Sequence, residues 1–132
     1  TSGQPAALRK MATASQIISY QDIVRRVPVP DHVFDYAVNL VRKSRPTLPE
    51  AADWIKKWVM WGAGPRAVQY LILGAKARAV LRGSYLVQID DIDAVAEPVM
   101  AHRILTNFHA ESEGVTSRDI IRRLLAEMKK EG

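Results

Sequence analysis

The sequence contains no cysteine among its 132 residues. Disulfide bonds and thiolate metal sites are therefore excluded, and a cytoplasmic location is compatible with this composition. The chain also lacks any run of about 18 apolar residues, so no transmembrane helix is expected. Residues 1–14 are polar and lack the apolar block of a secretory signal peptide, so no membrane or export role is expected.

The residues needed for a complete catalytic site are missing as well. No Gly-x-x-x-x-Gly-Lys-Ser/Thr loop is present to cradle phosphates, and no paired acids are placed to hold magnesium. His32, His102 and His109 lack metal-ligand spacing, so no metal site is expected. No serine or threonine has a base partner by spacing. The chain alone is therefore not expected to catalyse hydrolysis.

The net charge of +5 is spread unevenly along the chain. Residues 1–82 hold 13 Lys and Arg against 5 Asp and Glu, whereas residues 83–132 hold 6 against 9. A basic half favours an anionic partner: a nucleotide, a nucleic acid or an acidic protein face. An ordinary solvated surface explains many of these charges individually just as well.

Apolar periodicity predicts an all-α fold, a small bundle of about five helices. The 48% hydrophobic content fits one small domain, which we place at residues 13–132, and residues 1–12 are interpreted as a linker from an upstream segment. Thr13, Asp31 and the Thr116/Asp119 pair are expected to cap the first, second and last helices. The predicted helices span residues 14–27, 31–44, 65–82, 89–97 and 117–129.

Other segments are less regular. The stretch from Trp54 to Trp61 is compatible with a helix or a strand, and its three tryptophans, which share a helical face, favour core packing. Exposed tryptophan there would instead indicate an interface. Pro98 is expected to start a further short turn and residues 102–115 to form a loop. A short strand pair is possible between residues 85–87 and 103–105.

The helix at 65–82 is apolar on most sides, which predicts a central position.

The most informative segment is Gly62-Ala63-Gly64-Pro65-Arg66-Ala67. The glycines permit a tight turn, and Pro65 suits the first position of a helix. Arg66 then leaves the first helical turn beside the positive end of the helix dipole, with no carboxylate nearby in sequence. This arrangement predicts an anion-binding role, with phosphate as the natural ligand. From spacing alone, an arginine that pairs with a surface acid is the simpler alternative.

The region from residue 62 to residue 83 resembles the sensor-2 region of the MoxR family of AAA+ ATPases. It comprises residues 62–67, the Ala/Leu-rich helix that follows and Leu81-Arg82-Gly83. The flanking segments are similar to the family's lid as well, and the resemblance covers residues 13–130. These flanking segments are Val24 to Val29, Tyr36, Leu40 to Arg42, Asp91-Ile92, Val99 to Ile104 with His102-Arg103, and Glu113 to Thr116.

The resemblance implies that the chain is a C-terminal lid separated from its αβα core, which carries the Walker motifs and binds ATP with Mg²⁺. Arg66 would be the catalytic sensor-2 arginine that reaches the γ-phosphate, and Gly64, Pro65, Arg66 and Ala67 would border the nucleotide. The full-length parent would hydrolyse ATP, form a ring-shaped homo-oligomer and act as a cytoplasmic, chaperone-like factor. Its partners would be client complexes or proteins with von Willebrand factor A domains.

Two positions depart from the family pattern. Gly64 stands where the family often has serine, and Gln88 stands where a threonine or serine cap is common. Two alternatives remain open from the residues alone. The basic half could form a helical nucleic-acid-binding module through Lys76, Arg78 and Arg82, although such an apolar helix is poorly suited to an exposed recognition role. The chain could also be a protein-interaction domain in which Arg66 is structural.

Overall fold

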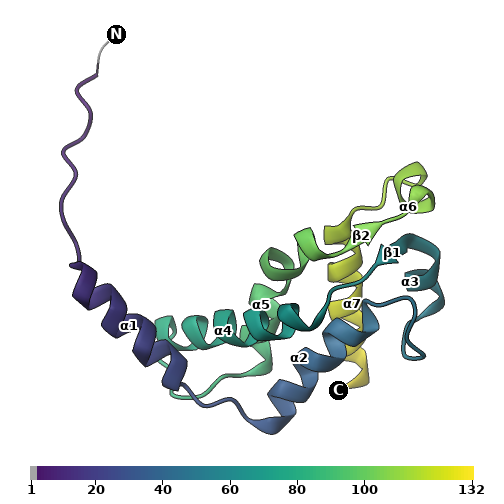
Figure 1. Cartoon of the computed structure of the whole chain (residues 1–132), viewed down its shortest axis with the longest axis horizontal. Coiled ribbons are helices and arrows are strands. Elements are labelled where there is room, and N and C mark those ends of the chain that lie inside the picture. Colours follow the sequence, from purple (N-terminus) through teal and green to yellow (C-terminus); the bar gives the residue numbers. More distant parts are fainter. Residues whose placement is uncertain (1–2) are drawn as a thin grey trace.

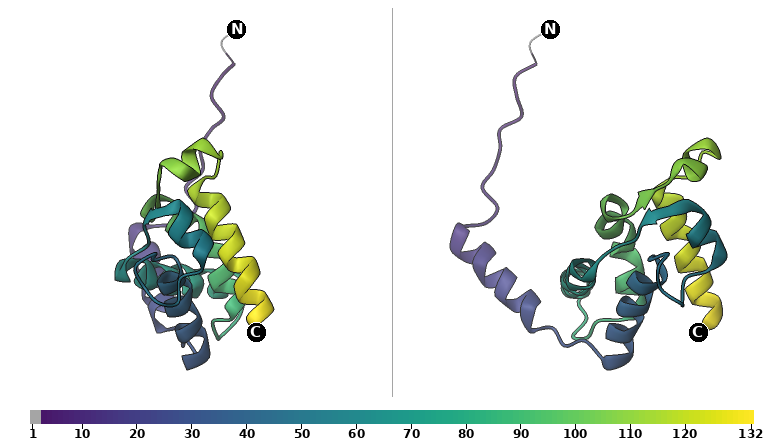
Figure 2. Two further views of the ribbon diagram at one scale, coloured as in Figure 1. Left: turned by 90° about the vertical axis from the view of Figure 1, so that its right-hand side faces the viewer. Right: turned by 45° about the vertical axis from the view of Figure 1, so that its right-hand side comes forward.

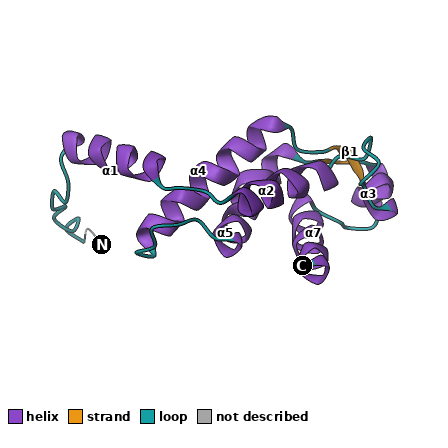
Figure 3. Ribbon diagram, turned by 90° about the horizontal axis from the view of Figure 1, so that it is seen from below, coloured by secondary structure: helices purple, strands orange, loops and turns teal. Residues whose placement is uncertain are grey.

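A computed structural model describes residues 3–132 of the chain. Residues 3–12 run as extended chain away from the helices, and the rest of the predicted linker, residues 1–2, lies outside the described residues (Figure 1). Helices form most of the remaining chain, as the ribbon coloured by secondary structure shows (Figure 3).

The predicted all-α architecture is confirmed, with one small strand pair. The long helices are α1 (Ala14–Arg26), α2 (Asp31–Lys43), α4 (Pro65–Leu81), α5 (Ile89–Met100) and α7 (Ser117–Glu131). The short elements are α3 (Asp53–Trp58), β1 (Val59–Trp61), the 3₁₀ turn η1 (Ala101–Arg103), β2 (Leu105–Thr106) and α6 (Phe108–Ser112). The predicted Thr13 cap and the predicted capping box of Thr116 with Asp119 are both present, and Thr13 also forms a capping box with Gln16.

Helix α4 lies at the centre of the bundle, where it contacts α1, α2 and α5 (Figures 1 and 2). Its buried stripe recurs every four residues as Ala67, Leu71, Ala75 and Ala79. Three of these four side chains are methyl groups, so the neighbouring helices can approach α4 closely. The predicted central position of this helix is therefore confirmed.

Helix α1 is an arm rather than a core element. None of its residues is buried, and Ile17, Tyr20 and Ile23 are each about half exposed. It lies beside α4 and leads to the connection before α2 (Figure 2). The exposed apolar side chains of α1 are therefore not covered by any other part of residues 3–132.

The start of α2 differs from the prediction. Asp31 is not a cap but the first residue of the helix, and the N-cap position belongs to Pro30. The backbone carbonyl of Pro30 accepts the N–H groups of Val33 and Phe34. Asp31 therefore contributes its charge to the first turn, where the helix dipole favours an acid.

The structure contains a strand pair, but one of its two strands is not the predicted one. Strand β2 pairs antiparallel with β1, not with residues 85–87, and Trp61 stands opposite Leu105. Residues 85–87 are instead tied to the connection between α1 and α2, because the buried Val87 donates its N–H to the carbonyl of Pro28.

Two further boundaries were also mispredicted. Pro98 lies inside α5, which continues to Met100 because the fully buried Met100 holds the last turn against the core. The predicted loop at residues 102–115 contains α6, whose start is capped by Asn107 through the N–H of Ala110. The end of α5 depends on packing, and the start of α6 depends on a single cap. Local periodicity reveals neither of them.

Candidate functional site

The loop before α4 is fixed against the end of α2. A methyl group built on Gly62 would lie 2.3 Å from the carbonyl oxygen of Ser44, so only glycine fits this position. The buried Ala63 donates its N–H to Ser44 Oγ at 3.0 Å, and that hydroxyl donates to the carbonyl of Val41 at 2.6 Å. Ser44 thus sets the position of the helix start. The sequence analysis missed it because no motif marks a serine that acts across 19 residues.

Arg66 occupies the second residue of α4 and is exposed to solvent. Gly64 is the N-cap and supplies no side chain to the free N–H groups, and the first turn contains no acid. Between residues 3 and 132, the Arg66 guanidinium takes part in no ion pair and no side-chain hydrogen bond. The surface acid that the simpler alternative requires is therefore absent from the described part of the chain.

The four predicted site residues differ in what they present to solvent. Pro65 and Arg66 are exposed and Gly64 is partly exposed, whereas Ala67 is fully buried. The N–H of Ala67 also donates to the carbonyl of Gly64 at 2.9 Å. The Ala67 side chain therefore faces the core, and the surface at the helix start is formed by its three neighbours.

A groove of about 740 Å³ runs between α2 and α4 and reaches Pro65. Apolar side chains such as Phe34, Val38 and Ile72 line it, together with four cations and no carboxylate. Two of these cations have partners, because Arg42 pairs with Glu50 and Lys76 donates to the carbonyl of Arg25. Part of the positive charge of the first half of the sequence thus lies along the groove between α2 and α4. The cations of this groove are Arg25, Arg42, Arg45 and Lys76.

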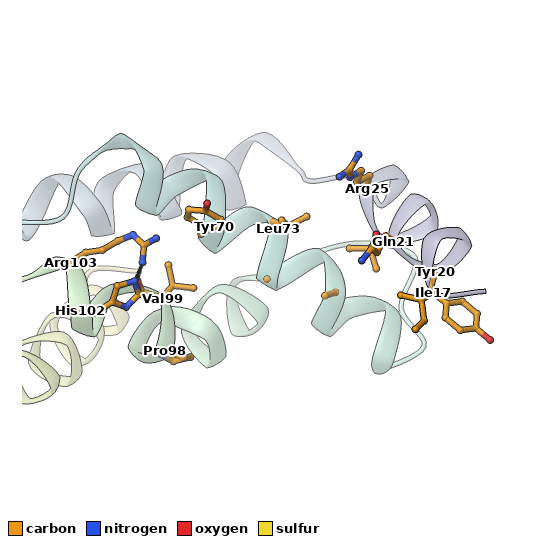
Figure 4. Close-up of a pocket in the computed structure, with 13 residues that line it drawn as sticks. Ile17, Tyr20, Gln21, Arg25, Tyr70, Leu73, Pro98, Val99, His102 and Arg103 are labelled. Atoms are coloured by element: carbon orange, nitrogen blue, oxygen red, sulfur yellow. Dashed lines mark hydrogen bonds between the residues drawn. The ribbon is translucent and has the colours of Figure 1, made fainter. Parts of the chain in front are cut away.

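A second groove, of about 690 Å³, lies on the other side of the exposed face of α4, between α1 and the end of α5 (Figure 4). Leu73 lines both grooves, so it marks the ridge between them. His102 and Arg103 lie at the end of the second groove next to Tyr70, away from the residues of α1. This groove also contains no carboxylate.

Arg78 and Arg82 are both engaged by a buried acid. Both bind the fully buried Asp91, with Arg78 Nη1 at 2.6 Å from Oδ1 and Arg82 Nη2 at 2.7 Å from Oδ2. Burial raises the pKa of Asp91, but hydrogen bonds from Arg82, the N–H of Gln88 and Arg78 outweigh it, and the pKa lies below its ordinary value. These two arginines are therefore not free to bind nucleic acid, which weakens that alternative.

The three tryptophans do not share one role. Trp54 and Trp58 are partly buried and meet edge to face with ring centroids 6.1 Å apart. The Arg123 guanidinium stacks 4.3 Å from the Trp54 ring. Trp61 is 69% exposed, because β1 replaces the helix from Val59 onward and breaks the shared helical face. Core packing is thus correct for the first two tryptophans and wrong for Trp61.

Within residues 3–132 no helix is long and apolar enough to cross a membrane. The same residues contain no group of three His, Asp or Glu side chains arranged to hold a metal ion.

Comparisons with known proteins relate the chain to ATPase lids. Residues 52–124 match the family model described as the AAA lid domain. The chain is 26% identical over 121 residues to the chaperone MoxR1 of Mycobacterium tuberculosis, which covers 92% of this chain and 32% of that protein. It is 44% identical over 55 residues to protein MoxR of Paracoccus denitrificans, covering 42% of this chain and 16% of that protein.

The fold is also similar to that of a Cytophaga hutchinsonii protein assigned as an ATPase, whose crystal structure superposes with a TM-score of 0.80 at 28% identity. The match covers 85% of this chain and 34% of that one. The chain therefore spans about a third of the length of the relatives that it matches over most of its own length.

Proposed function

The chain belongs to the AAA lid domain family, and from this premise we propose that it is the nucleotide-sensing lid of a MoxR-type AAA+ ATPase. In this proposal Arg66 is the sensor-2 arginine, which contacts the γ-phosphate of ATP bound mainly by a separate core domain. Gly64, Pro65 and the backbone around Ala67 border the nucleotide.

The observation that carries the proposal is the environment of the Arg66 side chain. It is exposed on the first turn of a rigid central helix, and no carboxylate among residues 3–132 neutralises it. The positive end of the α4 dipole adds to its charge. An exposed cation beside a positive helix end is disfavoured by about 0.3–1 kcal/mol. A bound phosphate would offset this cost, which supports a ligand at this position.

Exposed apolar surface on α1 and α4 supports a missing domain. Tyr20 and Ile23 of α1 and Leu73 of α4 are each about half exposed. Exposed apolar surface of this kind is typical of an interface. A core domain that covers these faces and supplies the Walker motifs would complete the site, and relatives about three times as long have room for one.

The mechanism follows from electrostatics. The core would supply Mg²⁺ and the phosphate-binding loop, which this chain lacks. The guanidinium of Arg66 would hold the γ-phosphate and stabilise the charge that develops as the phosphoryl group is transferred. Because Arg66 belongs to the lid, its contact with phosphate would also couple the angle of the lid to the nucleotide state.

The wider role is proposed by analogy with the relatives, of which one is named a chaperone. We propose that the parent protein forms a ring and works in the cytoplasm, where it matures or activates protein complexes. Its partners would be client complexes and proteins with von Willebrand factor A domains.

Replacement of Arg66 in the full-length parent tests the proposal. Arg66→Ala should lower ATP turnover at least about 100-fold, in the range expected for loss of one transition-state donor. Arg66→Lys should retain part of the activity, because the charge remains while the planar fork is lost. Circular dichroism should be unchanged, since the side chain is exposed.

Arg122→Ala is the matched control, because Arg122 is an exposed arginine of α7 that pairs with Glu97. Its turnover should equal that of the wild type. An Arg66→Ala variant with wild-type turnover would refute the role of this arginine.

A further inference from the structure

Arg103 is held in a defined position beside α4. Its guanidinium carbon lies 4.8 Å from the centroid of the Tyr70 ring, a distance that allows a cation–π contact. Its Nη1 donates to the carbonyl of Val99 at 2.8 Å, and it also contacts the ring of His102. Figure 4 shows Arg103 and His102 next to Tyr70 at one end of the groove. Three contacts therefore orient this guanidinium.

The position of Tyr70 places Arg103 near Arg66. Tyr70 follows Arg66 by four residues, so at about 100° per residue the two side chains lie roughly 40° apart on the helix, one turn from each other. Arg103 stacks on Tyr70, so its positive charge lies beside the turn that follows Arg66. Arg66 and the stacked pair of Tyr70 and Arg103 therefore lie on the same exposed face of α4, about one helical turn apart.

Neither the charge of Arg66 nor that of Arg103 is balanced by an acid among residues 3–132. Among residues 3–132, Arg103 forms no ion pair, as is also true of Arg66. No carboxylate lines the groove in which Arg103 lies. Other arginines of the fold do have carboxylate partners, for example Arg78 and Arg122. Two neighbouring cations without an acid repel each other, and a ligand with several negative charges relieves that repulsion.

We infer that Arg103 is a second phosphate-binding residue of the site that contains Arg66, with Tyr70 as the residue that positions it. The inference rests on the proposed nucleotide-sensing function. A polyphosphate would be held by Arg66 at the start of α4 and by Arg103 one turn further along. Both guanidinium groups can donate two parallel hydrogen bonds to phosphate oxygens.

The test compares nucleotides that differ in phosphate number, with the full-length parent and isothermal titration calorimetry. Arg103→Gln should weaken ATP binding by about tenfold or more, the effect of losing a charged hydrogen bond. AMP lacks the β- and γ-phosphates, so its affinity should stay close to that of the wild type. Arg103→Lys should restore part of the ATP affinity.

Two further variants separate phosphate binding from structure. Tyr70→Leu removes the stacking ring but leaves the guanidinium, so it should weaken ATP binding less than Arg103→Gln does. Arg118→Gln is the matched control, because this exposed arginine of α7 pairs with Glu97, and it should bind ATP as the wild type does.

The results also distinguish this inference from the proposed function. If Arg103→Gln leaves ATP affinity unchanged, or weakens ATP and AMP equally, Arg103 is structural or pairs with a carboxylate of another domain, and the inference is wrong. The proposed function would still stand if Arg66→Ala lowers turnover. If neither replacement affects ATP binding or turnover, both are wrong.

Discussion

Arginines on α4 face two different environments. Arg78 of α4 and Arg82 at its C-cap share the buried carboxylate of Asp91, whereas Arg66 is exposed to solvent with no acid partner in the described chain. The first arrangement links the end of α4 to the start of α5 and serves stability. The second leaves a charge available for a ligand. The environment of each arginine, rather than the residue type, therefore separates a structural role from the proposed ligand-binding role.

Replacement of Asp91 should destabilise the lid and alter its acid sensitivity. Asp91→Asn should lower the free energy of unfolding by roughly 1–3 kcal/mol, because buried hydrogen bonds to charged groups are lost. The folded pKa of Asp91 is depressed, so its stabilisation is complete above the ordinary value of 3.8 and is lost as the pH falls below it. Urea unfolding of wild type and variant at pH 7 and pH 3 measures both effects, and their difference should shrink at pH 3.

Glu97→Gln is the control for this experiment. Glu97 also faces two arginines, Arg118 and Arg122, but it lies at the surface, where water screens its ion pairs. Its replacement should have a much smaller effect at pH 7. Equal losses for the two variants would contradict a special role for the buried carboxylate.

At the scale of the element, the start of α4 depends on the end of α2. Gly62 lies against the backbone of Ser44 and Arg45, and Ser44 Oγ accepts the N–H of Ala63. The exposed turn that carries Arg66 is therefore anchored by buried contacts. This anchoring fixes the direction in which Arg66 leaves the bundle.

Two glycine replacements test the anchor. Gly62→Ala should lower the free energy of unfolding by about 1–3 kcal/mol, because the added methyl group meets backbone atoms that cannot move independently. Gly64→Ser is the matched control: its side chain meets nothing within 4 Å, and serine is a good N-cap, so stability should stay equal or rise slightly. Thermal unfolding of both variants gives the comparison. A neutral Gly62→Ala would show that the loop is not tightly held.

The helices could be predicted from the sequence because apolar periodicity and capping residues are local signals. The approximate spans of all five long helices, the Thr13 and Thr116 caps and the central position of α4 follow from such signals. The pairing of β1 with β2 joins residues more than 40 apart, and the periodicity of either strand does not encode its partner. The candidate site shows the same division. The local pattern singles out Arg66, whereas the contacts of Ser44 and Tyr70 join segments that are distant in sequence.

At the scale of the molecule, the exposed apolar surface is extensive for a chain of this size. It includes α1, parts of α4 and the strand pair with Trp61, while the core is formed chiefly by α2, α4, α5 and α7. In the proposed function, these surfaces would meet the core domain. The basic groove that reaches Pro65 lies beside the exposed face of α4. Arg66 and Arg103, which form no ion pair among residues 3–132, lie on or beside the same face.

The most direct measurement of the central claim is a structure of the full-length parent bound to a non-hydrolysable ATP analogue with Mg²⁺. We expect the Arg66 guanidinium to donate to a γ-phosphate oxygen at about 2.7–2.9 Å, the usual length of a charge-assisted hydrogen bond. The core domain should cover the exposed face of α4. A nucleotide bound by the core with Arg66 turned away from it, or paired with a carboxylate of another domain, would contradict the account.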